Sequence, residues 1–297
     1  MAYTFKFTTP VVRKNVRDLT STEKQNFITA LKALKAEGSY DVFVKRHVVA
    51  AAHSCPSTVD PLYRNAAHNG PAFHPWHRFF LHRLEVLLQK KVPGVGIPYW
   101  DWTQDAADPR SSPIWAPDFL GGDGDPNDGW LVKTGPLAVG QWTIVDENGQ
   151  PAGGLRRQFG INWSTFPPQG EDEISLHATP YDCSGWDTSS STSYRNRSEG
   201  WLGVQLHNKA HGWIGGSLLP MTSPNDPVFF LHHCNVDRLW AKWQELYPSQ
   251  GYEPVTGGPD GHNLNEQMHP WDAASASTLR VTPADVLNHK ALGYIYA

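Results

Sequence analysis

The feature that most constrains the fold of this chain is a set of histidines placed inside apolar, helix-like patterns. His207 and His211 stand four residues apart in LHNKAH, so on a helix their rings stack on one face. Further along, FFLHHCNVDRLW carries His232 and His233, which would point about 100° apart on a helix and could not both face one target. A helical pair of histidines alone is a weak sign of a metal site, because solvated or locally bonded imidazoles have the same spacing.

The apolar stripe of the second pattern distinguishes its two histidines. His233 shares a helical face with Phe229 and Trp240, large side chains that should turn toward the core. His232 lies off that stripe, so we expect His233 to look inward and His232 to be a structural imidazole. Asp237, one turn after His233, is expected to orient a ligand ring.

The N-terminal half repeats this arrangement. His77 opens the helical pattern HRFFLHRLEVLLQKK, His68 precedes it in AAHNGPAF, and His47 lies in an earlier helical pattern. Each half of the chain therefore offers three imidazoles, which come from two helices and the segments that lead into them. Several other histidines are expected to be structural, and His53 is the least certain because it lies near the first set: His53, His74, His82, His262, His269 and His289.

Two all-imidazole triads suit copper, zinc, iron or nickel by ligand type. Neither triad has an evident carboxylate ligand, which hydrolytic two-metal sites normally use. Three neutral imidazoles per ion match Cu(I), which tolerates low coordination and leaves room for dioxygen. Ligand chemistry therefore favours copper over zinc.

Helical patterns also organise the rest of the chain. Thr20 and Glu23 form a capping-box motif at the start of a first helix that ends before Gly38. WTIVDENGQPAGG predicts a short hairpin, and SSSTSYRNRSEG predicts a polar loop with Glu199 at its end. The expected fold is mainly α, with four core helices, long loops and a few short strands. Further helices are predicted from about Tyr40, from Pro75 to Pro93, around QLHNKAH, and from Asn225 to about Tyr247.

Composition and length narrow the class of protein. The 297 residues contain no linker or repeat, so one domain over residues 1–297 is expected. A net charge of −4 gives no basic face for nucleic acid or anionic lipid. The three cysteines indicate no disulfide framework. The start lacks a signal-peptide pattern and no apolar stretch reaches membrane-spanning length, so we expect a protein that is cytoplasmic or exported with a partner.

Two longer motifs resemble signatures of the type-3 copper proteins, and among these the bacterial tyrosinases. HNGPAFHPWHRFFLHRLE resembles the first-copper signature. DPVFFLHHCNVD resembles the second, and there the family pattern selects His233 over His232. The resemblance implies a four-helix bundle that holds a dinuclear copper site. It also implies that copper A is held by His47, His68 and His77, and copper B by His207, His211 and His233.

The resemblance implies an activity as well. Tyrosinases bind dioxygen between two copper ions, hydroxylate monophenols at the ortho position and oxidise o-diphenols to o-quinones. The implied ligands are thus two copper ions, dioxygen and small phenols such as tyrosine or DOPA-like compounds. A phenol with a pKa near 10 must lose its proton to coordinate copper well. Glu199 and Asn208 match a pair thought to hold a water as the phenol's base; otherwise Glu199 would be a helix-capping or surface acid.

The chain also departs from its relatives. Gly212 follows His211 where several bacterial tyrosinases carry a larger, often basic residue, so a wider entrance is expected. Cys55 lies between His47 and His68, an interval in which plant and fungal relatives carry a cysteine that forms a thioether with the second copper-A histidine. The spacing differs here, which leaves that bond open. Because no lid domain follows Ala297, any blocking partner is expected to be a separate chain, like the copper-delivering caddie proteins of some bacterial tyrosinases.

Three alternatives remain at this stage. Haemocyanins carry oxygen on the same two triads, but this chain is too short for a domain that shields the site from phenols, and Glu199 with Asn208 favours catalysis. A catechol oxidase or an o-aminophenol oxidase would share every metal ligand. A zinc protein would share the histidines but not the redox chemistry.

Overall fold

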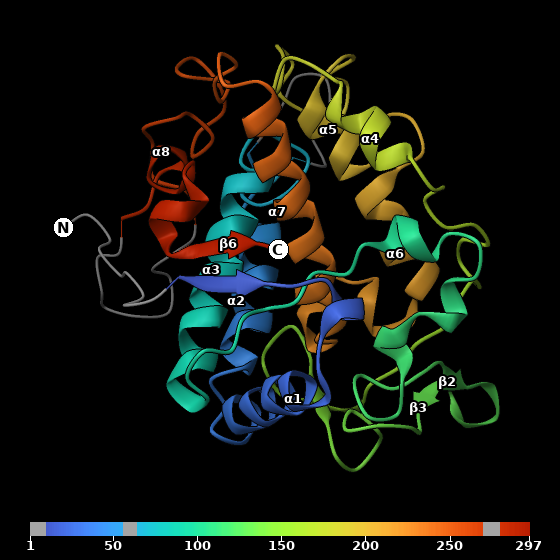
Figure 1. Ribbon diagram of the computed structural model, residues 1–297. Helices are drawn as coiled ribbons and strands as arrows, with labels where there is room; N and C mark the ends of the chain where they lie inside the picture. The colour runs from blue at the N-terminus through green and yellow to red at the C-terminus, as the bar shows by residue number, and fades with distance from the viewer. Residues whose placement is uncertain (1–9, 56–63, 270–279) are drawn as a thin grey trace.

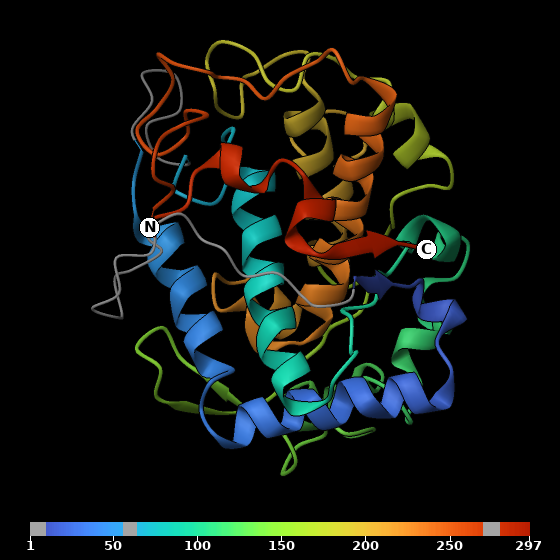
Figure 2. The same cartoon turned by 60° about the vertical axis from the view of Figure 1, so that its left-hand side comes forward.

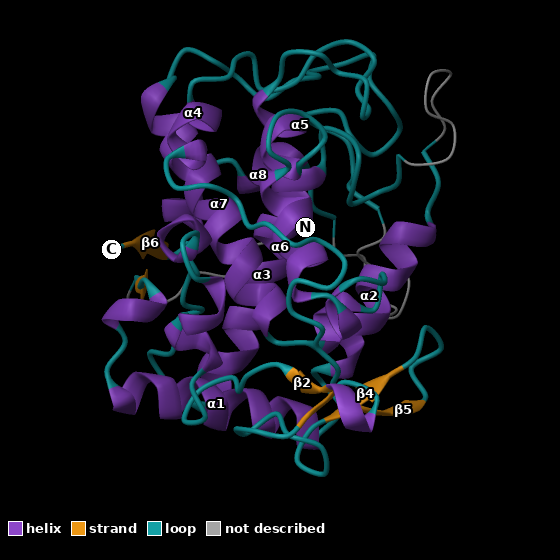
Figure 3. Cartoon of the chain, turned by 90° about the vertical axis from the view of Figure 1, so that its right-hand side faces the viewer, coloured by secondary structure: helices purple, strands orange, loops and turns teal. Residues whose placement is uncertain are grey.

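The computed structural model describes residues 10–55, 64–269 and 280–297. Helices form the body of the molecule and short strands lie at its periphery (Figure 3). The helices are α1 (Ser21–Ala36), α2 (Asp41–Ala52), α3 (Phe73–Lys91), α4 (Glu171–Leu176), α5 (Tyr194–Glu199), α6 (Leu206–Ile214), α7 (Val228–Leu246) and α8 (Pro283–Val286). Short 3-10 turns lie outside these helices at Val16–Asp18, Trp102–Asp105, Pro109–Ser111, Pro113–Trp115, Pro126–Asp128, Gly216–Leu218, Ser223–Asn225 and His289–Leu292.

Four helices, α2, α3, α6 and α7, make the centre of the fold (Figure 1). The side chains of α3 and α7 are buried on almost every side, as expected for helices enclosed by other elements. Figure 2 shows α1 lying across one end of α2 and α3, where it closes the bottom of the core. The mainly α fold with a four-helix core confirms the sequence prediction.

The strands pair in three two-stranded sheets. β1 (Val11–Arg13) pairs in parallel with β6 (Tyr294–Tyr296), which brings the first and last described segments together. β2 (Gly124–Asp125) pairs with β3 (Leu131–Val132). β4 (Thr143–Val145) and β5 (Pro151–Gly154) form the hairpin that the sequence predicts.

Helix boundaries follow local chemistry. The predicted capping box of α1 is present, since Glu23 N–H donates to Thr20 Oγ1 at 3.2 Å and Thr20 N–H donates to Glu23 Oε2 at 2.9 Å. α3 begins at Phe73, two residues before Pro75, which places the proline in the first turn where its missing N–H costs nothing.

One predicted loop is a helix. The segment predicted as polar loop contains α5, whose residues are mostly buried. Its start is capped by Ser193, whose Oγ accepts from Asn196 N–H at 3.1 Å. Arg195 is fully buried because it pairs with Asp182 at 2.8 Å and with Glu199 at 3.0 Å. The polar composition therefore reflects internal ion pairs rather than solvent exposure.

None of the helices in the described ranges combines the length and the apolar character that crossing a lipid bilayer requires.

Candidate metal centre

The six predicted ligand histidines gather into two groups in the middle of the four-helix core. In the first group, His47 comes from α2, His77 from α3 and His68 from the loop before α3; their candidate ligand atoms lie within 4.8 Å of one another. In the second group, His207 and His211 come from α6 and a histidine pair comes from α7. The structure thus brings all six side chains to two adjacent positions.

Hydrogen bonds fix the tautomer of five of these rings. In each, Nδ1 faces an oxygen that can only accept, so Nδ1 carries the hydrogen and Nε2 keeps its lone pair. The contacts are His47 to Met221 O at 2.7 Å, His68 to Asn65 Oδ1 at 3.2 Å, His77 to Phe73 O at 2.8 Å, His207 to Asn208 Oδ1 at 3.0 Å, and His211 to Leu218 O at 2.8 Å.

The free nitrogens converge. Nε2 of His47 lies 3.2 Å from Nε2 of His68, and Nε2 of His233 lies 3.2 Å from that of His207 and 3.4 Å from that of His211. Lone pairs of neutral rings at such distances repel each other unless a cation lies between them. With metal–nitrogen distances of about 2.0–2.1 Å, as in zinc sites, nitrogens 3.2 Å apart subtend roughly 100–105° at an ion. The donor set therefore fits one metal ion in each group.

The two groups are held side by side by ring contacts. The rings of His77 and His233 stack with centroids 4.3 Å apart. Phe73 lies 4.9 Å from His207 and 4.9 Å from His77, and Phe229 stacks on His233 at 4.1 Å. Aromatic side chains thus pack between and against the rings of both groups and hold the two groups next to each other.

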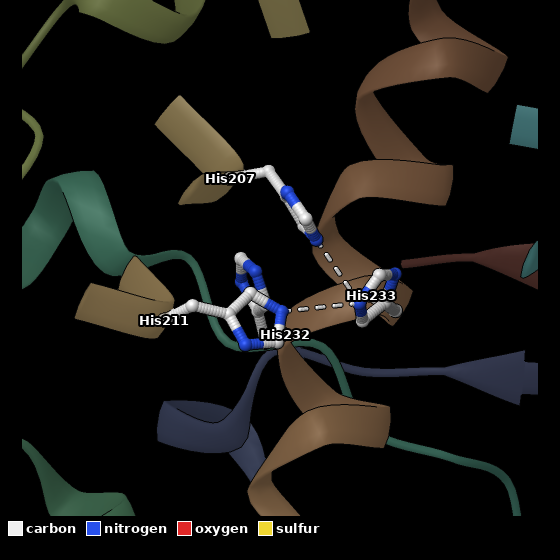
Figure 4. Close-up of side chains that lie close together, drawn as sticks. All are labelled: His207, His211, His232 and His233. Atoms are coloured by element: carbon white, nitrogen blue, oxygen red, sulfur yellow. Dashed lines mark hydrogen bonds between the residues drawn. The ribbon is translucent and has the colours of Figure 1, made fainter. Parts of the chain in front are cut away.

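His232 lies in the same group of rings but presents a different nitrogen. Trp102 Nε1–H donates to His232 Nδ1 at 3.0 Å, so the hydrogen of the neutral imidazole is on Nε2. Nε2 of His232 therefore has no lone pair for an ion. Figure 4 shows His207 and His211 linked to His233, with no such link to His232.

Burial keeps the rings neutral. It lowers the pKa of His47 and of His211 to about 4, and it lowers the pKa of His68, His77 and His233 well below the usual value, with the neighbouring histidines adding to the effect for those three. Neutral imidazole is the form that binds transition metals.

A cavity of about 440 Å³ opens onto both groups. Its walls combine ligand rings with the side chains of Glu199, Asn208, Trp163 and Met221. A cavity of this size accommodates a single phenolic ring together with water.

Glu199 is 1% exposed at the end of α5. Its Oε1 accepts from Asn69 N–H at 2.6 Å and its Oε2 accepts from Arg195 Nη1 at 3.0 Å. Burial raises the pKa of Glu199 to about 7, although Arg195 and the Asn69 N–H act in the opposite direction. Glu199 is thus neither a helix cap nor a surface acid.

Asn208 has a second contact that sequence reasoning missed. Its Oδ1 accepts from His207 Nδ1 at 3.0 Å, and its Nδ2 donates to Gly200 O at 3.3 Å. One amide hydrogen of Nδ2 remains for a group in the cavity. The adjacency of Asn208 to a candidate ligand in LHNKAH was the only available signal.

The wider entrance expected at Gly212 is not present. A Cβ on Gly212 would lie 2.5 Å from Trp163 Cδ2, so the indole of Trp163 occupies the space that a side chain at position 212 would take. Trp163 comes from the loop between β5 and α4. It was missed because only the fold brings that loop against α6.

The expected role of Asp237 is also wrong. Its carboxylate accepts from Arg78 Nε at 2.5 Å, Arg13 Nη1 at 3.2 Å and Tyr294 OH at 2.6 Å. Burial raises the pKa of Asp237, but Arg78 and Arg13 outweigh it and bring the pKa to about 2. Asp237 therefore joins α7 to α3, β1 and β6 instead of orienting a histidine ring.

The thiol of Cys55 is directed at two backbone carbonyl groups, an orientation that does not favour a thioether bond. Its Sγ lies 3.9 Å from His53 O and 3.6 Å from Asp260 O, and burial raises the pKa of the thiol to about 11. The residue is a free cysteine.

Comparison with known proteins gives a consistent answer. Residues 37–246 match the family model described as the common central domain of tyrosinase. The tyrosinase of Streptomyces glaucescens is 43% identical over 283 residues, which cover 94% of this chain and 97% of that protein. Grixazone synthase of Streptomyces griseus is 38% identical, with 94% and 96% covered.

Solved structures show the same fold. A single-site mutant of a polyphenol oxidase from Thermothelomyces thermophila aligns with a TM-score of 0.72 at 24% identity, over 97% of this chain and 89% of that one. A functional unit of octopus hemocyanin aligns with a TM-score of 0.59 at 22% identity, over 96% and 68%.

Proposed function

The chain belongs to the tyrosinase family of type-3 copper proteins, and from this premise we propose how its own residues hold two copper ions and deprotonate a phenol. It is a tyrosinase, which hydroxylates monophenols at the ortho position and oxidises o-diphenols to o-quinones. Two copper ions with dioxygen as co-substrate supply the oxidising chemistry.

We propose that His47, His68 and His77 hold copper A. The remaining ligands, His207, His211 and His233, would hold copper B. The support is the convergence of their Nε2 atoms together with the oxygen acceptors on Nδ1. Those acceptors keep each ring in one orientation and one tautomer, so little rearrangement is needed when an ion binds.

The phenol would enter the cavity beside Trp163 and reach the metal centre next to Glu199. We propose that Glu199 and Asn208 hold a water that takes the phenol proton. Each carboxylate oxygen of Glu199 has a second lone pair beyond its bond to Asn69 or Arg195, and Asn208 has a spare amide hydrogen. A phenol with a pKa near 10 needs such assistance at neutral pH.

The observation that carries this assignment is a carboxylate that is 1% exposed and lines the same cavity as His207 and His211. Burying a carboxyl group costs free energy, so its position at a reaction cavity points to catalysis. Oxygen uptake by the copper-loaded protein with tyrosine, 3,4-dihydroxyphenylalanine and o-aminophenol tests the substrate class. Oxidation of o-aminophenol without hydroxylation of tyrosine would argue for the related oxidase activity.

We further propose that residues 1–297 act as one tyrosinase-type dicopper domain. A single cluster of buried apolar side chains extends from Val11 to Tyr294 and supports this reading.

A separate copper-delivering protein of the caddie type is proposed as a partner. Trp201, Leu219 and Met221 line the cavity and are 43%, 45% and 44% exposed, so they form an apolar rim that an inserted side chain could cover. Co-expression with such a protein should raise the copper content and block phenol access until the two separate.

A further inference from the structure

A third group of candidate metal ligands lies outside the dicopper centre. Within the described residues, His53, Asp260 and His269 bring their donor atoms within 4.8 Å of one another. The rings of His53 and His269 stack with centroids 4.7 Å apart, and His269 Nε2 lies 3.3 Å from Asp260 Oδ2. We propose that these three side chains form a third metal site, which binds one divalent zinc or copper ion; the proposal does not depend on the function proposed for the cavity.

An ion pair alone does not account for this arrangement. A bond between His269 and Asp260 would explain the position of those two side chains but not the ring of His53 stacked beside them. Burial and the neighbouring His269 lower the pKa of His53, although Asp260 acts against this. Two stacked rings whose donor atoms lie within 4.8 Å of one carboxylate oxygen form an unfavourable place for two positive charges and a favourable place for one divalent cation.

The loop that carries Asp260 is held in a defined conformation. Gly261 has φ +75°, and a Cβ there would lie 2.7 Å from His269 Cδ2, so the glycine lets the imidazole lie against the backbone beside Asp260. Asn263 Nδ2 donates to Glu266 Oε2 at 2.7 Å, and Gly261 N–H donates to the same oxygen at 3.1 Å. The carboxylate is thus placed by a bonded loop, although its side chain is 80% exposed.

The chemistry of the donors selects the ion. Two imidazoles and one carboxylate are the three protein ligands of many zinc sites, in which a water takes the fourth position, and they also suit Cu²⁺. The nearby Cys55 is not a metal ligand at neutral pH, because burial raises the pKa of its thiol to about 11 and Sγ points at backbone carbonyls. The exposure of Asp260 gives the ion a path from solvent.

Both imidazoles belong to segments that support copper A. Backbone O of His53 accepts from Ala66 N–H at 3.1 Å, two residues before His68. Backbone O of His269 accepts from Trp76 Nε1–H at 3.0 Å, and Trp76 lies against the ring of His77 with centroids 5.0 Å apart. An ion at the third site would tie these segments together and stabilise the wall behind copper A.

The experiment uses protein already loaded with two copper ions. The sample is dialysed against micromolar Zn²⁺, and copper and zinc are counted by elemental analysis while thermal unfolding is followed. We expect copper to stay at two ions per chain, zinc to reach one, and the Tm to rise. His53→Ala with His269→Ala should abolish the zinc uptake and the Tm rise.

A milder variant and a control variant distinguish loss of the metal site from misfolding. Asp260→Asn changes an exposed group, and it should weaken zinc binding at least tenfold while copper content and diphenol oxidation stay unchanged. His177→Ala removes an exposed histidine outside the cluster and should bind zinc like the parent. Absence of a third ion in the parent, zinc that enters only as copper leaves, or full zinc binding by the double variant would each overturn the proposal.

Discussion

Trp102 donates its indole N–H to Nδ1 of His232 at 3.0 Å, and this bond distinguishes the Nε2 atoms of two adjacent histidines. The donor forces the hydrogen of His232 onto Nε2, whereas Nε2 of His233 lies 3.2 Å from Nε2 of His207 with no such restriction. Helical geometry points the two rings in different directions, and the Trp102 indole fixes the tautomer of His232.

Replacing His232 and His233 separately should give different losses, of stability in one variant and of copper in the other. We expect His233→Ala to lose one copper ion per chain. His232→Ala should keep both ions but leave the buried Trp102 N–H unpaired, at a cost of about 1–3 kcal/mol in the free energy of unfolding. Elemental analysis and urea unfolding measure the two effects. Loss of copper by the His232 variant together with retention by the His233 variant would reverse the assignment.

Glu199→Gln should separate the two activities. The amide keeps the size of the side chain but removes the negative charge that makes the bound water basic. General-base assistance contributes about 10²–10⁴-fold, so monophenol hydroxylation should fall by that order. Diphenol oxidation should change far less, because a diphenol offers a more acidic hydroxyl and a second oxygen for the other copper ion.

The measurement is the initial rate on tyramine and dopamine at equal copper loading. Glu173→Gln, an exposed glutamate on α4, is the control and should match the parent on both substrates. Equal losses on both substrates in the Glu199 variant would assign this residue to the fold or to the metal site.

Trp163 should contribute to phenol binding without affecting copper. Its indole lies where a side chain at Gly212 would project, at the wall of the cavity. We expect Trp163→Ala to raise KM for phenols roughly 2- to 12-fold, the equivalent of one aromatic contact. Ile161→Ala, which is on the same loop and 60% exposed, is the matched control. Unchanged KM for the Trp163 variant would remove the indole from the binding wall.

Asp237 should support stability in acid. Its pKa is about 2 in the folded protein against about 3.9 in an unfolded chain, so its contribution is complete above about pH 5 and is mostly lost as pH falls to 2. A shift of this size corresponds to about 2–3 kcal/mol. In metal-free protein, the unfolding free energy of the parent should therefore approach that of Asp237→Asn as pH falls from 4 to 2. A difference that stays constant over this range would contradict the assigned pKa.

The sequence by itself determined the helices and the candidate ligands. A period of 3.6 residues places His207 and His211 on one face and turns His233 toward the same side as Phe229, so local geometry alone was informative. The capping box of α1 and the β4–β5 hairpin were predictable for the same reason, because their interactions join residues a few positions apart. The family resemblance added the pairing of the two groups and the candidate base.

Only the tertiary structure decided which distant residues meet. Asp237 was predicted to face a ligand ring, but Arg13 is 224 positions away and captures its carboxylate. Trp163 fills the space beside Gly212, and the buried pair of Arg195 with Asp182 turns a polar segment into α5. Asp260 and His269 reach His53 across more than 200 residues of chain. Such contacts depend on the packing of all the helices at once, and no local period encodes the partner that a buried charge or an aromatic ring finally finds.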